Sequence, residues 1–222
     1  MKKGIWVFVL WLMATGGSAS ANDPTVWHSG ELMLNNGTQI KGELTFNWKA
    51  EVVQYRQGTI IKAYSVNQVY GFRYYDDQQG TVRKFVAVNC LGKAGRRHLR
   101  ILEEVVSGSL LVYRELRFVP ELIKVVSLKN YGMDDGLARN MDDFTYLVMT
   151  NEEMVPLSVF YRTMWPHLQT AFEVDLKRYA RDSQADMAHT LGQLRLICMY
   201  NSLVDKTMSS SPVESTALSV GH

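Results

Sequence analysis

The sequence lacks the short motifs that mark many enzymes and metal sites. It contains no G-x-S-x-G, S-x-x-K or H-E-x-x-H pattern and no glycine-rich phosphate loop. Its five histidines include no pair at the i, i+4 spacing that brings two imidazoles onto one metal ion. We therefore expect no metal and no cofactor. Any catalytic site would have to be assembled from residues far apart in the sequence.

Cysteine is also scarce, because Cys90 and Cys198 are the only two in the chain. In an oxidising compartment they could form one disulfide that closes a very long loop, worth about 4 kcal/mol in the chain-entropy model. The alternative is that each is a small buried apolar residue, Cys90 in an apolar strand and Cys198 on a helix. Both alternatives remain open, and a catalytic thiol is less expected than either.

The chain has no apolar run long enough to span a bilayer, which needs about 20 residues. Its first residues instead combine two lysines, the short apolar run Ile5 to Ala14 and the small residues Ala19-Ser20-Ala21. This order is typical of a secretory signal peptide, residues 1–21, cleaved after Ala21. We expect an exported protein, periplasmic or extracellular, with no transmembrane segment once the signal is removed.

An excess of charge of either sign is absent as well. The 24 Lys and Arg face 22 Asp and Glu, and the predicted signal removes Lys2 and Lys3 with no acidic residue, which leaves the mature chain neutral. A neutral protein has no overall field that attracts a phosphate backbone. We therefore expect no nucleic acid among its partners.

Short alternating segments separated by glycine-containing turns fill residues 22–157. The strongest local signal is Asn36-Gly37 between two alternating segments, because both residues tolerate the positive φ of a tight hairpin turn. We predict one antiparallel sheet, rolled or barrel-like. The predicted strands are 31–34, 38–46, 51–55, 59–64, 68–75, 81–91, 98–106, 109–115, 144–149 and 154–157.

The period of the apolar residues changes after Pro156, and residues 158–205 read as helices. We predict helices over 158–164, from Pro166 onward, and over 183–204. The last has a stripe of Met187, Leu191, Leu194 and Cys198, widened by Ile197 and Tyr200. The fold class is therefore α+β, with a small C-terminal helical bundle packed on the sheet, and the Ser-rich residues 206–222 read as a disordered tail.

The spacing Leu34-x-x-Gly37-Thr38-x-Ile40-x-Gly42-x-Leu44 resembles the opening strands of Sm-like and SH3-like barrels, in which a glycine lets a strand bend. The resemblance implies a curled sheet. The resemblance does not imply RNA binding. The two RNA-binding positions of Sm proteins correspond here to Asn47-Trp48-Lys49 and Gly71-Phe72-Arg73, which do not match the Sm pattern. The layout of signal, strands and helical tail is also similar to uncharacterised exported proteins of bacterial envelopes, for which no activity is known.

Two groups of residues are candidates for binding. The first is the basic cluster Lys93, Arg96, Arg97, His98 and Arg100, which could contact an envelope protein, a glycan or an anionic surface; alternatively it only keeps a sheet edge soluble. The second is an aromatic set in which Tyr74 and Tyr75 could stack on sugar rings or peptide. Such alternating aromatics could instead fill the core between the sheet and the helices.

Two further clusters carry weaker signals. The acidic stretch 134–143 could wrap a calcium ion, although its spacing is not that of an EF-hand, and a solvated loop is the simpler interpretation. His189 follows Asp186 by three residues on a predicted helix, which favours an exposed pair over a catalytic dyad.

We expect a non-enzymatic binding or structural module of the cell envelope. The alternative is a hydrolase-type enzyme in the cleft between sheet and helices, with His167 or His189 beside an acid and a serine.

Overall fold

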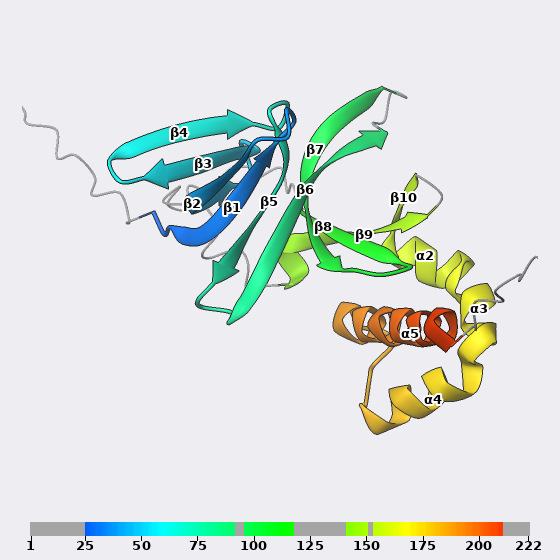
Figure 1. Cartoon of the computed structure of the whole chain (residues 1–222). Helices are drawn as coiled ribbons and strands as arrows, with labels where there is room; N and C mark the ends of the chain where they lie inside the picture. Colours follow the sequence, from blue (N-terminus) through cyan, green and yellow to red (C-terminus); the bar gives the residue numbers. More distant parts are fainter. Residues whose placement is uncertain (1–24, 92–95, 118–140, 151–152, 211–222) are drawn as a thin grey trace, which may run out of the picture.

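The computed structural model describes residues 25–91, 96–117, 141–150 and 153–210. They form an α+β fold in which a ten-stranded antiparallel sheet, not closed into a barrel, is followed by helices packed against it (Figure 1). This confirms the predicted fold class. In this part of the chain no helix is both long enough and apolar enough to span a bilayer. The predicted signal, residues 1–21, and residues 211–222 of the predicted tail lie outside the described ranges.

The strands lie in the order β10-β9-β8-β7-β6-β5-β1-β2-β3-β4, so β1 is inserted between β2 and β5. Each lies within three residues of a predicted strand at both ends. The strands are β1 His28–Leu34, β2 Gln39–Asn47, β3 Val52–Gln57, β4 Ile60–Ser65, β5 Val69–Asp76, β6 Thr81–Leu91, β7 Arg97–Val106, β8 Leu111–Leu116, β9 Phe144–Thr150 and β10 Glu153–Pro156.

The sheet curls over an aromatic core. Trp48, in the turn between β2 and β3, lies 5.5 Å from the ring of Phe85 on β6 and 5.2 Å from that of Phe144 on β9. These strands are well separated in the strand order, so the two halves of the sheet face each other. Phe72 stacks on Phe85 at 4.5 Å, and Phe46 lies 5.3 Å from the same ring. Phe72 is thus a core residue, as one interpretation of the aromatic set has it, but its ring neighbours Phe46, Tyr74 and Phe85 belong to the sheet rather than to the helices.

The aromatic side chains of β5 are divided between its two faces by a bulge. Phe72 and Tyr74 are buried, but Tyr70 is 63% exposed. The register explains the difference: Met33 of β1 faces Gly71 while Leu34 faces Val69, so Tyr70 is an extra residue on β5. The bulge places Tyr70 on the outer face of the sheet.

A chain of charged side chains is buried in the curl. Arg83 of β6 makes two hydrogen bonds of 2.8 Å to the carboxylate of Glu103 on β7, and Arg114 of β8 donates to the same carboxylate at 2.6 Å. Asp76 lies 3.5 Å from Arg83. The guanidinium of Arg114 lies over the ring of Phe144 at 4.3 Å. Each of the four charged residues is less than 8% exposed, so the charges depend on each other rather than on water.

The helices begin directly after the last strand. The second predicted helix is divided, and α4 ends where Gln184 adopts a positive φ of 50°. The third begins later than predicted and extends to Ser210, so Lys206–Ser210 are helical rather than part of a tail. The elements are α2 Leu157–Thr163, α3 Trp165–Leu168, η2 Gln169–Phe172, α4 Glu173–Asp182 and α5 Thr190–Ser210, with the short η1 Met141–Asp143 before β9.

The predicted apolar stripe of the last helix is only partly correct. Leu194 and Ile197 are buried as predicted, but Met187 and Leu191 are exposed, and Leu196, outside the predicted stripe, is almost fully buried. Trp165 of α3 is buried among aromatic rings, 5.0 Å from Tyr161 and otherwise close to Phe160 and Tyr200. The helices therefore form an aromatic cluster of their own beside the last strands.

Asn201 fastens α5 to the sheet. Its side chain is buried and donates Nδ2 hydrogen bonds to the carbonyls of Ser107 and Leu110, while its Oδ1 accepts from the Leu110 amide, all at 2.9 Å. Gly108 lies under this amide with a φ of 129°, and a Cβ there would come within 2.6 Å of Nδ2. One polar side chain thus satisfies the turn between β7 and β8.

We predict that Asn201→Ala lowers the free energy of unfolding by about 2–4 kcal/mol, because three hydrogen bonds are lost and buried backbone groups of the turn are left unsatisfied. Chemical denaturation followed by circular dichroism measures the change. Ser202→Ala, at the exposed next position of the helix, is the control and should shift the midpoint little. Equal effects of the two variants would contradict this role of Asn201.

The buried charges generate a second prediction. Glu103→Gln leaves two buried guanidinium groups without their carboxylate and should cost about 3–5 kcal/mol of stability. Glu173→Gln removes an exposed i, i+4 pair with Lys177 and should leave the stability close to that of the wild type, because solvent screens this pair. Thermal unfolding of both variants beside the wild type tests the contrast, and a stability of Glu103→Gln close to that of the wild type would refute it.

Candidate functional site

The hairpin of β6 and β7 continues beyond its neighbours in the sheet. β5 pairs with β6 only as far as Val86, and β8 pairs with β7 only from Glu103 onward. Residues 87–91 and 97–101 are therefore paired only with each other. We call this two-stranded projection the ribbon. Its free end lies at the β6–β7 connection, where the sequence places most of the predicted basic cluster.

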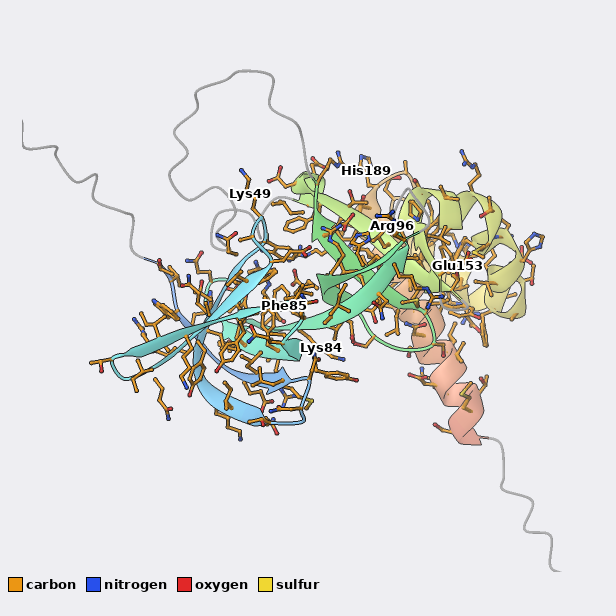
Figure 2. The ribbon with its side chains drawn as sticks, turned by 90° about the horizontal axis from the view of Figure 1, so that it is seen from above. Lys49, Lys84, Phe85, Arg96, Glu153 and His189 are labelled. Atoms are coloured by element: carbon orange, nitrogen blue, oxygen red, sulfur yellow. The ribbon has the colours of Figure 1, made fainter. Side chains whose placement is uncertain are left out.

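The end of the ribbon carries exposed cations. Arg96, labelled in Figure 2, and Arg97 are exposed, as is His98. Within the described ranges, no ion pair or hydrogen bond involves the side chains of these three residues. Lys93, a fourth member of the predicted cluster, lies outside those ranges. The structure thus keeps Arg96 and Arg97 together as the ribbon tip.

Arg100 was predicted with this cluster but has a different role. It pairs with Glu51 at 2.6 Å and with Glu115 of β8 at 2.8 Å. Burial would lower the pKa of Arg100, but the hydrogen bond to Glu51 and the charge of Glu115 outweigh burial and raise it. Arg100 lines a cavity of about 260 Å³ beside Trp48. It joins the β2–β3 turn to the opposite half of the sheet rather than presenting a free charge.

The two candidate tyrosines lie on opposite faces of β5. Tyr74 is only 1% exposed and stacks on His28 with ring centroids 4.5 Å apart. The prediction of Tyr74 as a surface residue is therefore wrong, because alternation turns it into the core. Tyr75 is 46% exposed on the outer face, where it is available to a ligand.

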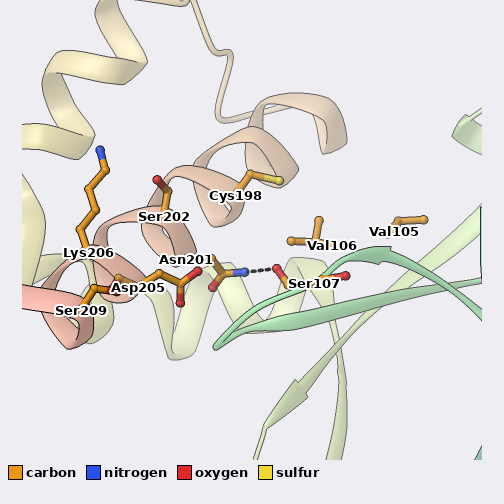
Figure 3. A pocket seen from close by; sticks show the side chains of 9 residues that line it. All are labelled: Val105, Val106, Ser107, Cys198, Asn201, Ser202, Asp205, Lys206 and Ser209. Atoms are coloured by element: carbon orange, nitrogen blue, oxygen red, sulfur yellow. Dashed lines mark hydrogen bonds between the residues drawn. The ribbon is translucent and has the colours of Figure 1, made fainter. Parts of the chain in front are cut away.

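A groove of about 650 Å³ runs between α5 and the end of β7 (Figure 3). It is the cleft in which the alternative hypothesis placed an enzyme site. Its lining is Val105, Val106, Ser107, Cys198, Asn201, Ser202, Asp205, Lys206 and Ser209. Sequence reasoning missed this set, although Cys198, Ser202, Asp205 and Ser209 recur at the three- and four-residue spacing of one helix face.

The predicted histidines do not reach this groove. His167 is exposed on α3, and neither it nor His189 contributes to the lining. The His189 imidazole lies 2.7 Å from the Asp186 carboxylate, and both side chains are exposed. The pair is thus a surface contact at the start of α5. Among the described residues, neither histidine joins the serines that line the groove.

Both cysteines are free thiols. Cys90 is half-buried on the ribbon, with its sulfur 3.7 Å from the Val88 carbonyl and 3.9 Å from the sulfur of Met154 on β10. Cys198 is exposed in the groove. Desolvation raises the pKa of both thiols. A raised pKa keeps a cysteine in its unreactive thiol form.

The acidic stretch proposed for calcium is described only in part. Asp142 and Asp143 lie in η1, and residues 134–140 fall outside the described ranges. Among the residues that the structure does describe, no three His, Cys, Asp or Glu side chains gather closely enough to hold a metal ion.

Comparison of the chain with protein-family models, with curated proteins and with solved structures found no match.

We predict that the two thiols of the native chain react slowly with DTNB at pH 7, and that the rate still increases above pH 8.5, the usual pKa of cysteine. The reason is that desolvation disfavours the thiolate at both sites. Cys198→Ser should remove the faster phase, because Cys198 is the exposed thiol. A native chain without titratable thiols would contradict the free state of the cysteines, and a rate that levels off below pH 8 would contradict the raised pKa.

Proposed function

We propose that the protein is an exported, non-enzymatic binding module of the cell envelope, and that its ribbon tip binds an anionic membrane surface. Export is supported by the signal-like residues 1–21. Binding is supported by the unpaired cations Arg96 and Arg97 and by Lys93, which the sequence places at the same hairpin connection.

The pairing of the other arginines carries this proposal. Every other arginine in the described strands is paired with a carboxylate: Arg56 with Glu43, Arg73 with Glu31, Arg83 and Arg114 with Glu103, and Arg100 with Glu51 and Glu115. Arg97 lies in a strand as well, yet its charge is left to solvent at the end of a projection. A cation that is neither neutralised nor buried remains available to an external anion.

Charge magnitudes set the expected strength. A Lys or Arg near an anionic lipid surface contributes about 1 kcal/mol, and the attraction decays within a Debye length. Two arginines therefore contribute about 2 kcal/mol, or roughly 30-fold in affinity. The mature chain is predicted to be neutral overall, so this binding is local to the tip and sensitive to salt.

The enzyme alternative has less support in the geometry. The groove of Figure 3 contains polar side chains but neither His167 nor His189. The residues that the hydrolase hypothesis required are therefore on other surfaces of the helices.

We predict that Arg96→Glu/Arg97→Glu lowers the affinity for vesicles of phosphatidylglycerol and phosphatidylcholine by at least about 30-fold at low salt. Co-sedimentation measures the bound fraction, and vesicles of phosphatidylcholine alone give the background. The matched control is Arg162→Glu/Arg181→Glu, which makes the same charge change at exposed positions of α2 and α4. Equal binding by the two double variants, or no binding by the wild type, would overturn the proposal.

A further inference from the structure

Two hollows lie next to each other on the outer face of β1, β2, β5 and β6. The first, of about 210 Å³, is lined by Met33, Tyr70 and Val86, among others. The second, of about 410 Å³, includes Tyr75. Glu31 and Arg73 line both, so this charged pair stands between the two hollows. The ribbon tip contributes to neither.

Gly71 is one of the residues that line the first hollow. A Cβ at Gly71 would lie 2.8 Å from the carbonyl oxygen of Phe85, so the position excludes other residues. Beside it, the bulge on β5 turns Tyr70 outward until 63% of it is exposed, and Met33 is 39% exposed. An aromatic ring and apolar side chains thus surround a space that the sheet leaves open.

The polar groups between the hollows are held in place. Arg73 forms an ion pair with Glu31 across β5 and β1, and the Gln39 amide donates to the other carboxylate oxygen of Glu31 at 2.6 Å. The hydrogen bond from Arg73 lowers the pKa of Glu31, which keeps the carboxylate ionised. Lys84, labelled on β6 in Figure 2, is tied to Glu104 at 2.8 Å at the edge of the first hollow. These groups offer both hydrogen-bond donors and acceptors to a ligand.

The sizes and spacing restrict the ligand. Pockets for drug-sized molecules span roughly 300–1,000 Å³, so the first hollow has room for little more than one ring. Tyr70 and Tyr75 are five residues apart on β5, about 16 Å at 3.3 Å per residue. Each hollow therefore has an exposed tyrosine, and the two hollows share one Glu31–Arg73 pair at their common edge. Two tyrosines with a polar pair between them fit a ligand made of repeated units.

We propose that this face binds an oligosaccharide chain, with one sugar ring on Tyr70 and another on Tyr75. Sugar rings have apolar faces that pack on aromatic side chains, and their hydroxyls both donate and accept hydrogen bonds. Glu31, Arg73 and Gln39 supply the matching partners between the two rings.

Other chain-like ligands fit less well. A lipid acyl chain would cover the Glu31–Arg73 pair with methylene groups and would desolvate it without giving hydrogen bonds in return. In an extended peptide, side chains on one face recur about every 7 Å, which does not match a spacing of about 16 Å. The oligosaccharide satisfies both the apolar hollows and the charged pair between them.

Isothermal titration of the full chain with three hexasaccharides, built of N-acetylglucosamine, glucose or galacturonate, tests this proposal. We expect at least one to bind, and its trimer to bind at least tenfold more weakly because it cannot reach both tyrosines. Tyr70→Ala and Tyr75→Ala should each weaken the hexamer about tenfold, because each removes the aromatic face on which a sugar ring packs. Tyr70→Phe should retain binding.

Ile61→Ala is the control, because Ile61 is 58% exposed on β4 and lines neither hollow. Arg96→Glu/Arg97→Glu should bind the hexamer like the wild type, which separates this site from the ribbon tip. If none of the three hexamers binds, or if Tyr70→Ala and Ile61→Ala have the same effect, the proposal is overturned.

Discussion

The carboxylate of Glu103, shared by Arg83 and Arg114, is the constraint on which the rest of the structure depends. It lies out of water with two guanidinium groups, so each charge is tolerable only while the others stay in place. The three residues come from β6, β7 and β8, and a slip of one residue in any of these strands would turn a buried charge to the wrong face. This contact therefore fixes the register of the central strands.

That register also decides which groups the protein offers to a partner. Side chains that point to the inside of the curl, such as Trp48 and Phe85, are buried in the core. Residues on the outer face and at the ribbon tip are not needed for the core, and the two proposed binding surfaces are made of them. The ribbon tip would bind its partner through charge, and the outer face would bind its partner through the shape of its two hollows. The two proposed surfaces are thus separate from each other and differ in the chemistry of the partner that each would bind.

Local signals made much of the fold predictable from the sequence. Asn36-Gly37 forms the predicted turn, with Gly37 at a φ of 82°. The positive φ that such a turn requires is supplied by the turn residues themselves, so it can be predicted from local sequence. Alternation placed Tyr74 and Tyr75 on opposite faces of β5, but it could not tell which face was buried. That choice depends on Phe85 and His28, which are distant in sequence. The bulge at Tyr70 depends on the pairing of β5 with β1, which local sequence does not determine. A buried Arg–Glu pair inside a sheet likewise has no sequence motif by which it could be predicted.

The curl is closed by side chains, since β4 and β10 at the edges of the sheet do not pair with each other. Trp48 against Phe144, and Arg100 between Glu51 and Glu115, hold the two halves together. The backbone ladder and this closure are thus separate levels of stability. The closed shape of the sheet therefore depends on a tryptophan and one arginine, whereas the pairing of the strands depends on their backbone hydrogen bonds.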